Sequence, residues 1–271
     1  MSGAPMNGLV PLGSAPANQW QVDSARVDLV RSQPAPRPLD LAASPQRLRL
    51  DLARTALVII DMQNDFCHPE GWLASIGVDV GPARVPIAPL VAVRSACAAA
   101  GMPVVWVNWG NRADRLNLGP ATLHVYDADG SGGGLGARIG ARGKVLEAGT
   151  WCAAVVEEFG DTSAEIHVAK YSMSGFWDTP LDAILRNLGV TTLLMGGVNL
   201  DQCVLATLQD ASFRGYDCVL LEECAATTSP EFCARAALYN IRQCFGFTAS
   251  AADLLDALAE PACAATRGVS A

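Results

Sequence analysis

The sequence predicts an α/β fold: a single three-layer, doubly wound domain with a mainly parallel sheet of six strands. Two observations lead to this prediction. Short apolar runs alternate along the chain with longer segments in which apolar residues recur at helical spacing. The short runs are apolar at successive positions, which is typical of parallel strands that helices cover on both faces.

The predicted strands are the short apolar runs. In chain order they are Thr55–Ile60, Pro103–Asn108, Glu165–Ala169, Thr192–Met195, Cys218–Leu221 and Phe245–Thr248. The carboxyl ends of parallel strands share one edge of a sheet, and ligands bind there, near the point where the strand order reverses. Polar residues that directly follow these strands are therefore the first candidates for function.

The predicted helices lie between and after these strands. Proline stands where a first helical turn begins, at Pro180 and Pro230, and Gly101, Gly189 and Gly215 each follow a helix end. In chain order the helices are Pro86–Ala100, Pro180–Leu188, Val204–Arg214, Pro230–Gln243 and Ala251–Ala259.

Three segments depart from this alternation. Residues 1–50 are rich in proline, which blocks ladders and helices, so we expect an extended N-terminal arm before a folded domain over 51–260. Residues 261–271 are expected to form a loose tail. The glycine-rich segment 110–150 has Arg138 and Val145 where a Walker phosphate loop needs glycine and a hydroxyl residue. We expect this segment to be a lid or a contact between subunits.

Composition excludes several classes of function. The net charge is −8 and the 19 lysines and arginines are scattered, which argues against a nucleic-acid partner. No apolar run is long enough to cross a membrane, and the first residues lack the pattern of a signal peptide. The nine cysteines include no Cys-x-x-Cys pair, so we expect reduced, mostly buried thiols and a cytoplasmic protein. We expect no metal and no cofactor, and we interpret His68, His124 and His167 as structural.

Three polar residues stand at strand ends. Asp61 directly follows Thr55–Ile60, Lys170 follows Glu165–Ala169, and Cys203 precedes the helix that begins at Val204. Each alone has a purely structural interpretation: Asp61 as a cap of the next loop, Lys170 as a solvated side chain and Cys203 as a packed thiol. Together they predict nucleophilic catalysis. A helix N-terminus and a nearby ammonium lower the pKa of a thiol, and a carboxylate can take its proton and pass it to a leaving amine.

The segment before Cys203 predicts a site for a developing negative charge. Gly196 and Gly197 allow a tight turn, and backbone N–H groups at the start of the next helix, including that of Cys203, can bind an oxyanion. Five residues near the strand ends are candidates for a substrate pocket, or else pack the floor of the crevice: Phe66, Asn108, Trp109, Tyr171 and Phe176.

These motifs together resemble the isochorismatase-like superfamily of cysteine hydrolases. The motifs are the run 60–66 (Ile-Asp-Met-Gln-Asn-Asp-Phe), Lys170 after a strand, and Gly196-Gly197-Val198 leading to Cys203-Val204. The resemblance covers about residues 50–258. Within the superfamily the chain looks most similar to ureidoacrylate amidohydrolases, and it resembles biuret hydrolases through residues 61–67.

The resemblance implies a Rossmann-like fold and a catalytic triad of Asp61, Lys170 and Cys203. It implies a cis peptide between Val198 and Asn199, with the N–H groups of Asn199 and Cys203 forming the oxyanion hole. The implied reaction is metal-free hydrolysis of a C–N bond in a small ureide or amide, through a thioester-type intermediate, with release of ammonia. Relatives form dimers and tetramers, which implies a homo-oligomer.

Two features distinguish this chain from relatives. Leu200 replaces a usual threonine, so support for the turn before Cys203 is expected to differ. Residues 76–81 lack the metal-binding histidine of nicotinamidases, which argues against a metal-dependent nicotinamidase. Isochorismatases proper, which cleave a vinyl ether, lack the nucleophilic cysteine, so Cys203 argues against that reaction as well. Two alternatives to a ureidoacrylate-type hydrolase stay open: a biuret-type or N-carbamoyl amide hydrolase, and a catalytically silent binding protein of the same fold.

Overall fold

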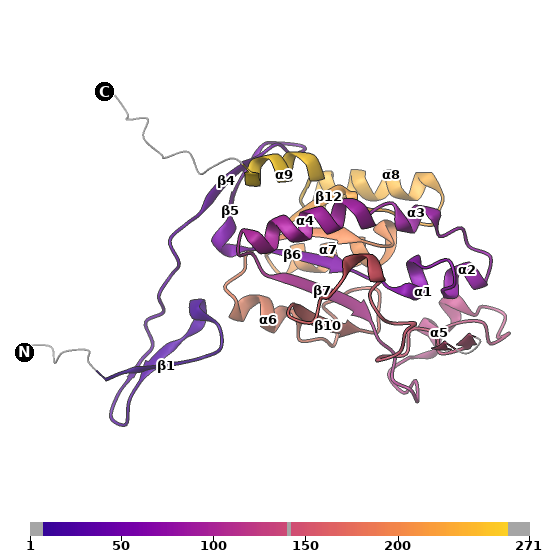
Figure 1. The fold of residues 1–271 in the computed structure, drawn as a ribbon, viewed down its shortest axis with the longest axis horizontal. Helices are drawn as coiled ribbons and strands as arrows, with labels where there is room; N and C mark the ends of the chain where they lie inside the picture. Colours follow the sequence, from indigo (N-terminus) through magenta and orange to yellow (C-terminus); the bar gives the residue numbers. More distant parts are fainter. Residues whose placement is uncertain (1–7, 140–141, 260–271) are drawn as a thin grey trace, which may run out of the picture.

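The computed structural model describes residues 8–139 and 142–259 and contains a central six-stranded sheet (Figure 1). The strand order is β10-β7-β6-β11-β12-β13, and every neighbouring pair is parallel. The strands are β6 (Thr55–Ile60), β7 (Val104–Trp109), β10 (Ile166–Lys170), β11 (Thr192–Gly197), β12 (Asp217–Ala225) and β13 (Phe247–Ala249). The fold class predicted from the sequence is confirmed.

Helices cover both faces of the sheet. The chain passes from β6 to β7 in one direction and from β11 through β12 to β13 in the other. Because such crossovers are right-handed, the helices of the two directions lie on opposite faces. One face carries α4 (Ile87–Ala99), against which α9 (Ala251–Ala259) packs, and the other carries α6 (Leu181–Asn187), α7 (Leu205–Phe213) and α8 (Glu231–Asn240).

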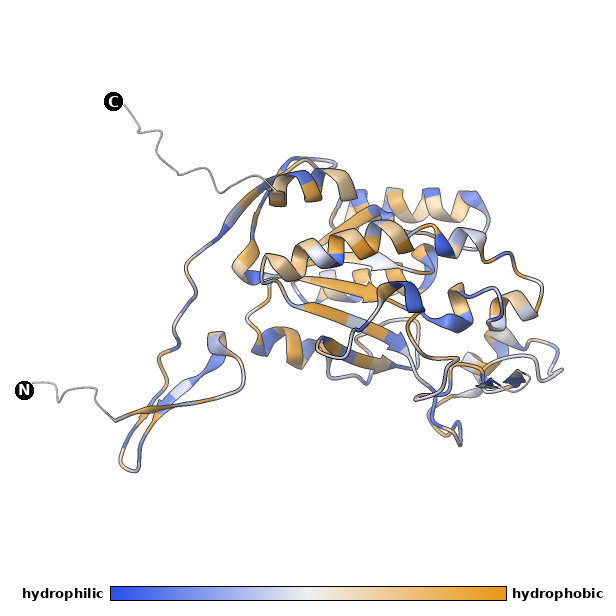
Figure 2. Cartoon of the chain, viewed as in Figure 1, coloured by the Kyte–Doolittle hydropathy of each residue, from blue (hydrophilic) through white to orange (hydrophobic). Residues whose placement is uncertain are grey.

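The core is centred on the two middle strands. Every residue of β6 and of β11 is buried, and Figure 2 shows the central strands as mainly hydrophobic. This matches the expectation for parallel strands that are covered on both faces. The buried side chains hold the carboxyl ends of β6 and β11 next to each other, with Gly197 opposite Ile60.

Two predicted boundaries differ in ways that matter for function. β10 includes Lys170, which pairs in register with Trp109 at the end of β7, so Lys170 ends its strand and does not follow it. A π-helical turn, η4 (Leu200–Val204), precedes α7 and contains Cys203. Cys203 therefore lies inside a helical turn and not just before one.

The expectation that proline keeps the N-terminal arm free of ladders is wrong. The arm contains an antiparallel sheet of β1 (Val10–Leu12), β2 (Trp20–Val22) and β3 (Val27–Asp28), which projects from the body (Figure 1). A second ladder joins β4 (Pro38–Leu41) to β5 (Leu48–Asp51). Proline is compatible with these ladders because it stands at the first position of a strand or on an edge strand.

The remaining elements are short. The segment 110–150 contains α5 (Pro120–Tyr126) and the two-residue strands β8 (Arg138–Ile139) and β9 (Gly143–Lys144). Helical turns elsewhere are η1 (Pro16–Asn18), η2 (Leu52–Arg54), α1 (Asn64–Cys67), α2 (Trp72–Ser75), α3 (Gly81–Arg84), η3 (Glu157–Phe159) and η5 (Ile241–Phe245). Within the described ranges, none of the helices has the length and apolar character needed to span a bilayer. The predicted tail, 261–271, lies outside the described residues.

Candidate active site

The three residues predicted from strand ends meet at the point where the strand order reverses. β6 and β11 are neighbours, and the connections that leave them run in opposite directions across the sheet. Asp61 directly follows β6, Cys203 lies in the turn after β11, and Lys170 ends β10. All three side chains are buried, with 1%, 3% and 0% of their respective surfaces exposed. The topology therefore places them together at the edge of the sheet where open parallel sheets bind their ligands.

Lys170 links the other two residues. Its Nζ lies 2.8 Å from Asp61 Oδ2 and donates to Cys203 Sγ at 3.3 Å. A second donation goes to the carbonyl oxygen of Ser172 at 3.0 Å. The ammonium therefore donates to the thiol and to a backbone carbonyl, and its contact with the Asp61 carboxylate is an ion pair, in which Oδ2 accepts no hydrogen bond within the described residues.

Trp109, predicted as a pocket residue, contacts both ends of this ion pair. Its backbone N–H donates to Asp61 Oδ1 at 3.0 Å, and its ring centre lies 4.3 Å from Lys170 Nζ. The indole Nε1 donates to the buried side chain of Asn111 at 2.6 Å, which fixes the ring. Trp109 thus restrains the carboxylate through its backbone and stabilises the ammonium through its ring face.

Gln63 is a structural contributor that sequence reasoning missed. Its Oε1 accepts from the N–H of Trp109 at 2.8 Å, and its Nε2 donates to the carbonyl oxygens of Trp109 at 2.8 Å and Ala153 at 2.6 Å. The side chain is fully buried. A buried amide must satisfy its donors and acceptor, so Gln63 ties Trp109 into the strand end. Its place in the 60–66 motif, two residues beyond Asp61, was the available signal.

The thiol of Cys203 does not have the lowered pKa expected from its place in the sequence. Burial raises the pKa of Cys203 to about 12, although the charge of Lys170 opposes this. Burial also raises the pKa of Asp61 against the opposing effect of Lys170. Burial lowers the pKa of Lys170, but the charges of Asp61 and Cys203 outweigh it, and the net shift is upward. The raised pKa keeps the proton on the thiol, because desolvation outweighs a single nearby cation.

The turn that carries Cys203 is held by the segment 226–229. The peptide bond between Val198 and Asn199 is cis. Asn199 Oδ1 accepts from the N–H of Thr228 at 3.1 Å, and Leu200 donates its N–H to the carbonyl oxygen of Ala226 at 2.8 Å. Leu200 itself is buried in the core.

Two further side chains of the same turn bind this segment. Asp201 Oδ1 accepts from the hydroxyl of Thr227, and Gln202 Nε2 donates to Ser229 Oγ at 3.2 Å. The polar side chains at 199, 201 and 202 thus each bind a different residue of 227–229, which we call the hydroxyl brace (Thr227–Ser229). The brace supports the turn where Leu200 lacks a hydroxyl of its own.

The other predicted pocket residues are placed less closely around the triad. Asn108 precedes Trp109 on β7, and in the described part of the chain its Oδ1 is buried without a hydrogen-bond partner. Phe66 packs edge-on against Trp72, and Tyr171 is half-buried after Lys170. Phe176 instead packs against Tyr216, with ring centres 5.9 Å apart, and under the Arg214 guanidinium, on the side of α6 and α7.

The described residues contain no cluster of three or more His, Cys, Asp or Glu side chains arranged to hold a metal ion. His68 packs edge-on against Trp151, and the ring of His167 stacks on Trp106. These two histidines therefore take part in aromatic packing.

A sequence profile of the isochorismatase domain matches residues 55–253, well over half of the chain. The chain belongs to the isochorismatase family. The matched range contains Asp61, Lys170, Cys203 and the hydroxyl brace, whereas the N-terminal arm lies before it.

Solved structures share the isochorismatase-family fold. An isochorismatase family protein from Desulfovibrio vulgaris is 28% identical, with a TM-score of 0.61, covering 76% of this chain and 99% of that one. A cysteine hydrolase from Pseudomonas syringae pv. phaseolicola is 23% identical, with a TM-score of 0.66 and coverage of 82% and 97%. An N-carbamoylsarcosine amidase from Thermoplasma acidophilum is 24% identical, with a TM-score of 0.55 and coverage of 73% and 96%.

Proposed function

We propose that this protein is a cysteine amidohydrolase that cleaves a C–N bond of a small ureide or amide and releases ammonia, without a metal. The observation that carries the proposal is the position of Lys170 Nζ, within 2.8 Å of Asp61 and 3.3 Å of Cys203. A carboxylate and a thiol on either side of one ammonium supply a base, a nucleophile and a fixed charge in a water-excluded site.

The first half of the reaction begins with proton transfer. Asp61 takes the thiol proton of Cys203 as the sulfur attacks the substrate carbonyl carbon, and the carbonyl oxygen becomes an oxyanion. The N–H groups of Asn199 and Cys203 bind that oxyanion, and Lys170 balances the charge. Burial raises the pKa of Asp61, which makes it a stronger base and brings it nearer to the thiol that it deprotonates.

The second half returns the enzyme to its starting state. The C–N bond breaks, Asp61 gives its proton to the departing nitrogen, and ammonia leaves a thioester-type intermediate on Cys203. Water then attacks this intermediate while Asp61 takes a proton from it. The C–S bond breaks, the acid or carbamate product leaves, and the proton returns to the sulfur.

The proposed substrate class is supported by the side chains predicted to line the pocket. The Oδ1 atom of Asn108, buried without a partner among the described residues, is an acceptor for the N–H donors of a ureido group. Phe66, Trp109 and Tyr171 are the apolar candidates for the pocket wall. We favour a ureidoacrylate-like substrate, with biuret-type and N-carbamoyl compounds as alternatives. The name of the N-carbamoylsarcosine amidase relative supports C–N cleavage.

We also infer a homo-oligomer, a dimer or tetramer, that forms through the N-terminal arm. The small sheet β1–β3 and the two residues that follow it leave large apolar side chains exposed: Val10, Leu12, Trp20, Val27, Leu29 and Val30. A sheet this small needs a covered apolar face for stability. Sedimentation of the full chain against a version that begins at Arg37 tests this, since the shortened chain should sediment as a smaller species.

The function is tested by ammonia release from a panel of ureidoacrylate-like, biuret-like and N-carbamoyl compounds. Cys203→Ala and Cys203→Ser should both abolish turnover, whereas Cys97→Ala, a change at another buried cysteine in α4, should retain it. Activity that persists in Cys203→Ala would contradict the mechanism. A folded wild-type protein that turns over no compound but binds one would favour the silent binding protein.

A further inference from the structure

A cavity of about 700 Å³ lies between the N-terminal arm and the body, far along the sheet from the triad. The arm contributes Asn18, Arg31 and Gln33, and the body contributes Arg54 just before β6 and the end of α6. These body residues stand at the amino ends of β6 and β11, whereas the triad stands at the carboxyl ends. The cavity is therefore separate from the candidate active site.

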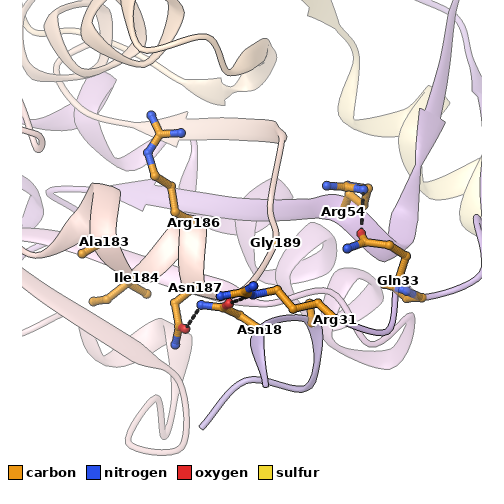
Figure 3. A pocket seen from close by; sticks show the side chains of 11 residues that line it. Asn18, Arg31, Gln33, Arg54, Ala183, Ile184, Arg186, Asn187 and Gly189 are labelled. Carbon is orange, nitrogen blue, oxygen red and sulfur yellow. Dashed lines mark hydrogen bonds between the residues drawn. The ribbon is translucent and has the colours of Figure 1, made fainter. Parts of the chain in front are cut away.

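The lining is basic, although the chain as a whole is acidic. It includes Arg31, Arg54 and Arg186 and no aspartate or glutamate, in a chain whose net charge is −8. Arg186 already has a carboxylate partner, because its Nε donates to Asp182 Oδ2 at 2.9 Å, and Figure 3 shows its side chain turned away from Arg31. Two arginines are left to give the cavity its charge.

Arg31 and Arg54 bind only neutral acceptors. Arg31 donates to Asn18 Oδ1 and to the carbonyl oxygen of Leu29, and Arg54 Nη1 donates to Gln33 Oε1 at 3.2 Å (Figure 3). Within the ranges 8–139 and 142–259, neither guanidinium forms an ion pair with a carboxylate. Both positive charges are thus uncompensated at the cavity.

Arg54 also has an unused donor. Its Nε is buried and has no hydrogen-bond partner in the described part of the chain. A buried N–H without an acceptor is destabilising, and buried polar groups in folded proteins are almost always paired. An oxyanion in the cavity, which Arg54 lines, would offset the positive charge of both guanidinium groups.

We propose that this cavity binds a small oxyanion with two negative charges, of the phosphate or dicarboxylate class. Guanidinium groups bind both through paired charge-assisted hydrogen bonds. The amides of Asn18 and Asn187, which bind each other at 2.8 Å, lie at the same opening and add neutral donors. Because Arg31 belongs to the arm and Arg54 to the body, a bound anion fastens the arm to the body.

The test uses the full chain and two separate ligands, inorganic phosphate in one series of titrations and succinate in a second. Each is titrated by calorimetry and by thermal unfolding, with sodium chloride holding the ionic strength constant. Saturable binding with a rise in Tm is expected for at least one of the two anions. The anion that binds more tightly identifies the class of oxyanion.

Variants assign the binding to the cavity. Arg31→Gln and Arg54→Gln should each weaken binding about tenfold, in line with the loss of a charge-assisted hydrogen bond. Arg47→Gln, an exposed arginine outside the cavity, should leave the affinity unchanged. If Arg54→Gln fails to fold, Arg31→Gln alone decides, because that side chain is exposed and its loss leaves the core intact. Affinity that is unchanged in Arg31→Gln, or a rise in Tm that chloride reproduces at equal ionic strength, would overturn the proposal.

Discussion

The ammonium of Lys170 lies against the ring face of Trp109, with Nζ 4.3 Å from the ring centre. The same tryptophan donates its backbone N–H to Asp61, the partner of that ammonium. One residue therefore contacts both charges of a fully buried ion pair. Such a pair is stable only when further interactions compensate its desolvation, and Trp109 supplies two of them.

Replacing Trp109 should lower turnover more than its loss of volume alone explains. Trp109→Leu removes the ring face, which is worth about 2 kcal/mol at a desolvated site, or about 30-fold in rate if the whole effect falls on the transition state. Trp109→Phe keeps a ring and loses only the Nε1 bond to Asn111, so its effect should be smaller. Steady-state kcat and KM of both variants measure the difference.

Trp106→Leu is the matched control for this change. Trp106 is a buried tryptophan on the same strand, three positions away, so its side chain faces the other side of the sheet. Trp106→Leu should lower Tm about as much as Trp109→Leu does and should retain the kcat of the wild type. Equal losses of kcat in Trp106→Leu and Trp109→Leu would show that the effect is general destabilisation.

Lys170→Met should make stability depend more strongly on pH. Removing the ammonium leaves the Asp61 carboxylate buried without its counter-charge, at a cost of about 3–5 kcal/mol. The pKa of Asp61 is already raised by burial, so the folded state holds this proton more tightly than the unfolded chain does. The protein therefore loses stability as pH rises above 3.8, the ordinary pKa of an aspartate carboxyl. In Lys170→Met this loss of stability continues to higher pH than in the wild type.

Thermal unfolding between pH 5 and pH 8 checks this prediction. Lys170→Met should lose more Tm across that interval than the wild type. In the double variant Asp61→Asn with Lys170→Met no buried charge is left at the pair, so the additional pH dependence should disappear. Persistence of that dependence in the double variant would assign it to another group.

The strand-end positions of Asp61, Lys170 and Cys203 were predictable because the edge of a parallel sheet collects residues from distant parts of the chain. The β6 boundaries and the helix α9 matched the prediction, since apolar runs and proline or glycine signals are local. The ladders of the arm were missed, because proline restricts a strand only where a ladder needs its N–H.

The role of Gln63 and the function of the hydroxyl brace depend on contacts between segments far apart in sequence. Gln63 reaches Trp109 and Ala153, and the brace reaches the turn at 199–202 from 25 or more residues away. No local pattern encodes such pairs. The raised pKa of Cys203 differs from the prediction for a related reason: its charged neighbours can be inferred from the strand ends, whereas the depth of its burial depends on packing across the whole fold.

Cys203 should react slowly with iodoacetamide in the absence of substrate. Burial raises its pKa to about 12, so little of the thiol is ionised at pH 8, and only 3% of its surface is exposed. Cys244 is exposed and Cys233 is half-buried, so both should be modified first. Peptide mapping by mass spectrometry in a Cys263→Ser background, which removes the one cysteine beyond the described residues, gives the order of labelling. Fastest labelling at Cys203 would indicate a site that opens readily and a thiolate stabilised by Lys170.

Leu200→Thr should destabilise the protein without raising its turnover. Leu200 is buried in the core, so a hydroxyl there replaces apolar contacts and needs a partner that the core does not supply. The turn is already held by the hydroxyl brace, so a hydroxyl at position 200 adds little further support. We expect a loss of about 1–3 kcal/mol in unfolding free energy, with kcat within about twofold of the wild type.

Asn199→Ala provides the comparison that separates positioning of the turn from its stability. This variant removes the acceptor of the Thr228 N–H, a bond worth about 1 kcal/mol, while leaving the core packing of Leu200 in place. It should lower kcat about fivefold with little change in KM, because in the proposed mechanism the backbone N–H groups of this turn bind the oxyanion in the transition state and not the bound substrate. If Leu200→Thr raised kcat and Asn199→Ala left it unchanged, the threonine of other family members, and not the brace, would be the support that the turn requires.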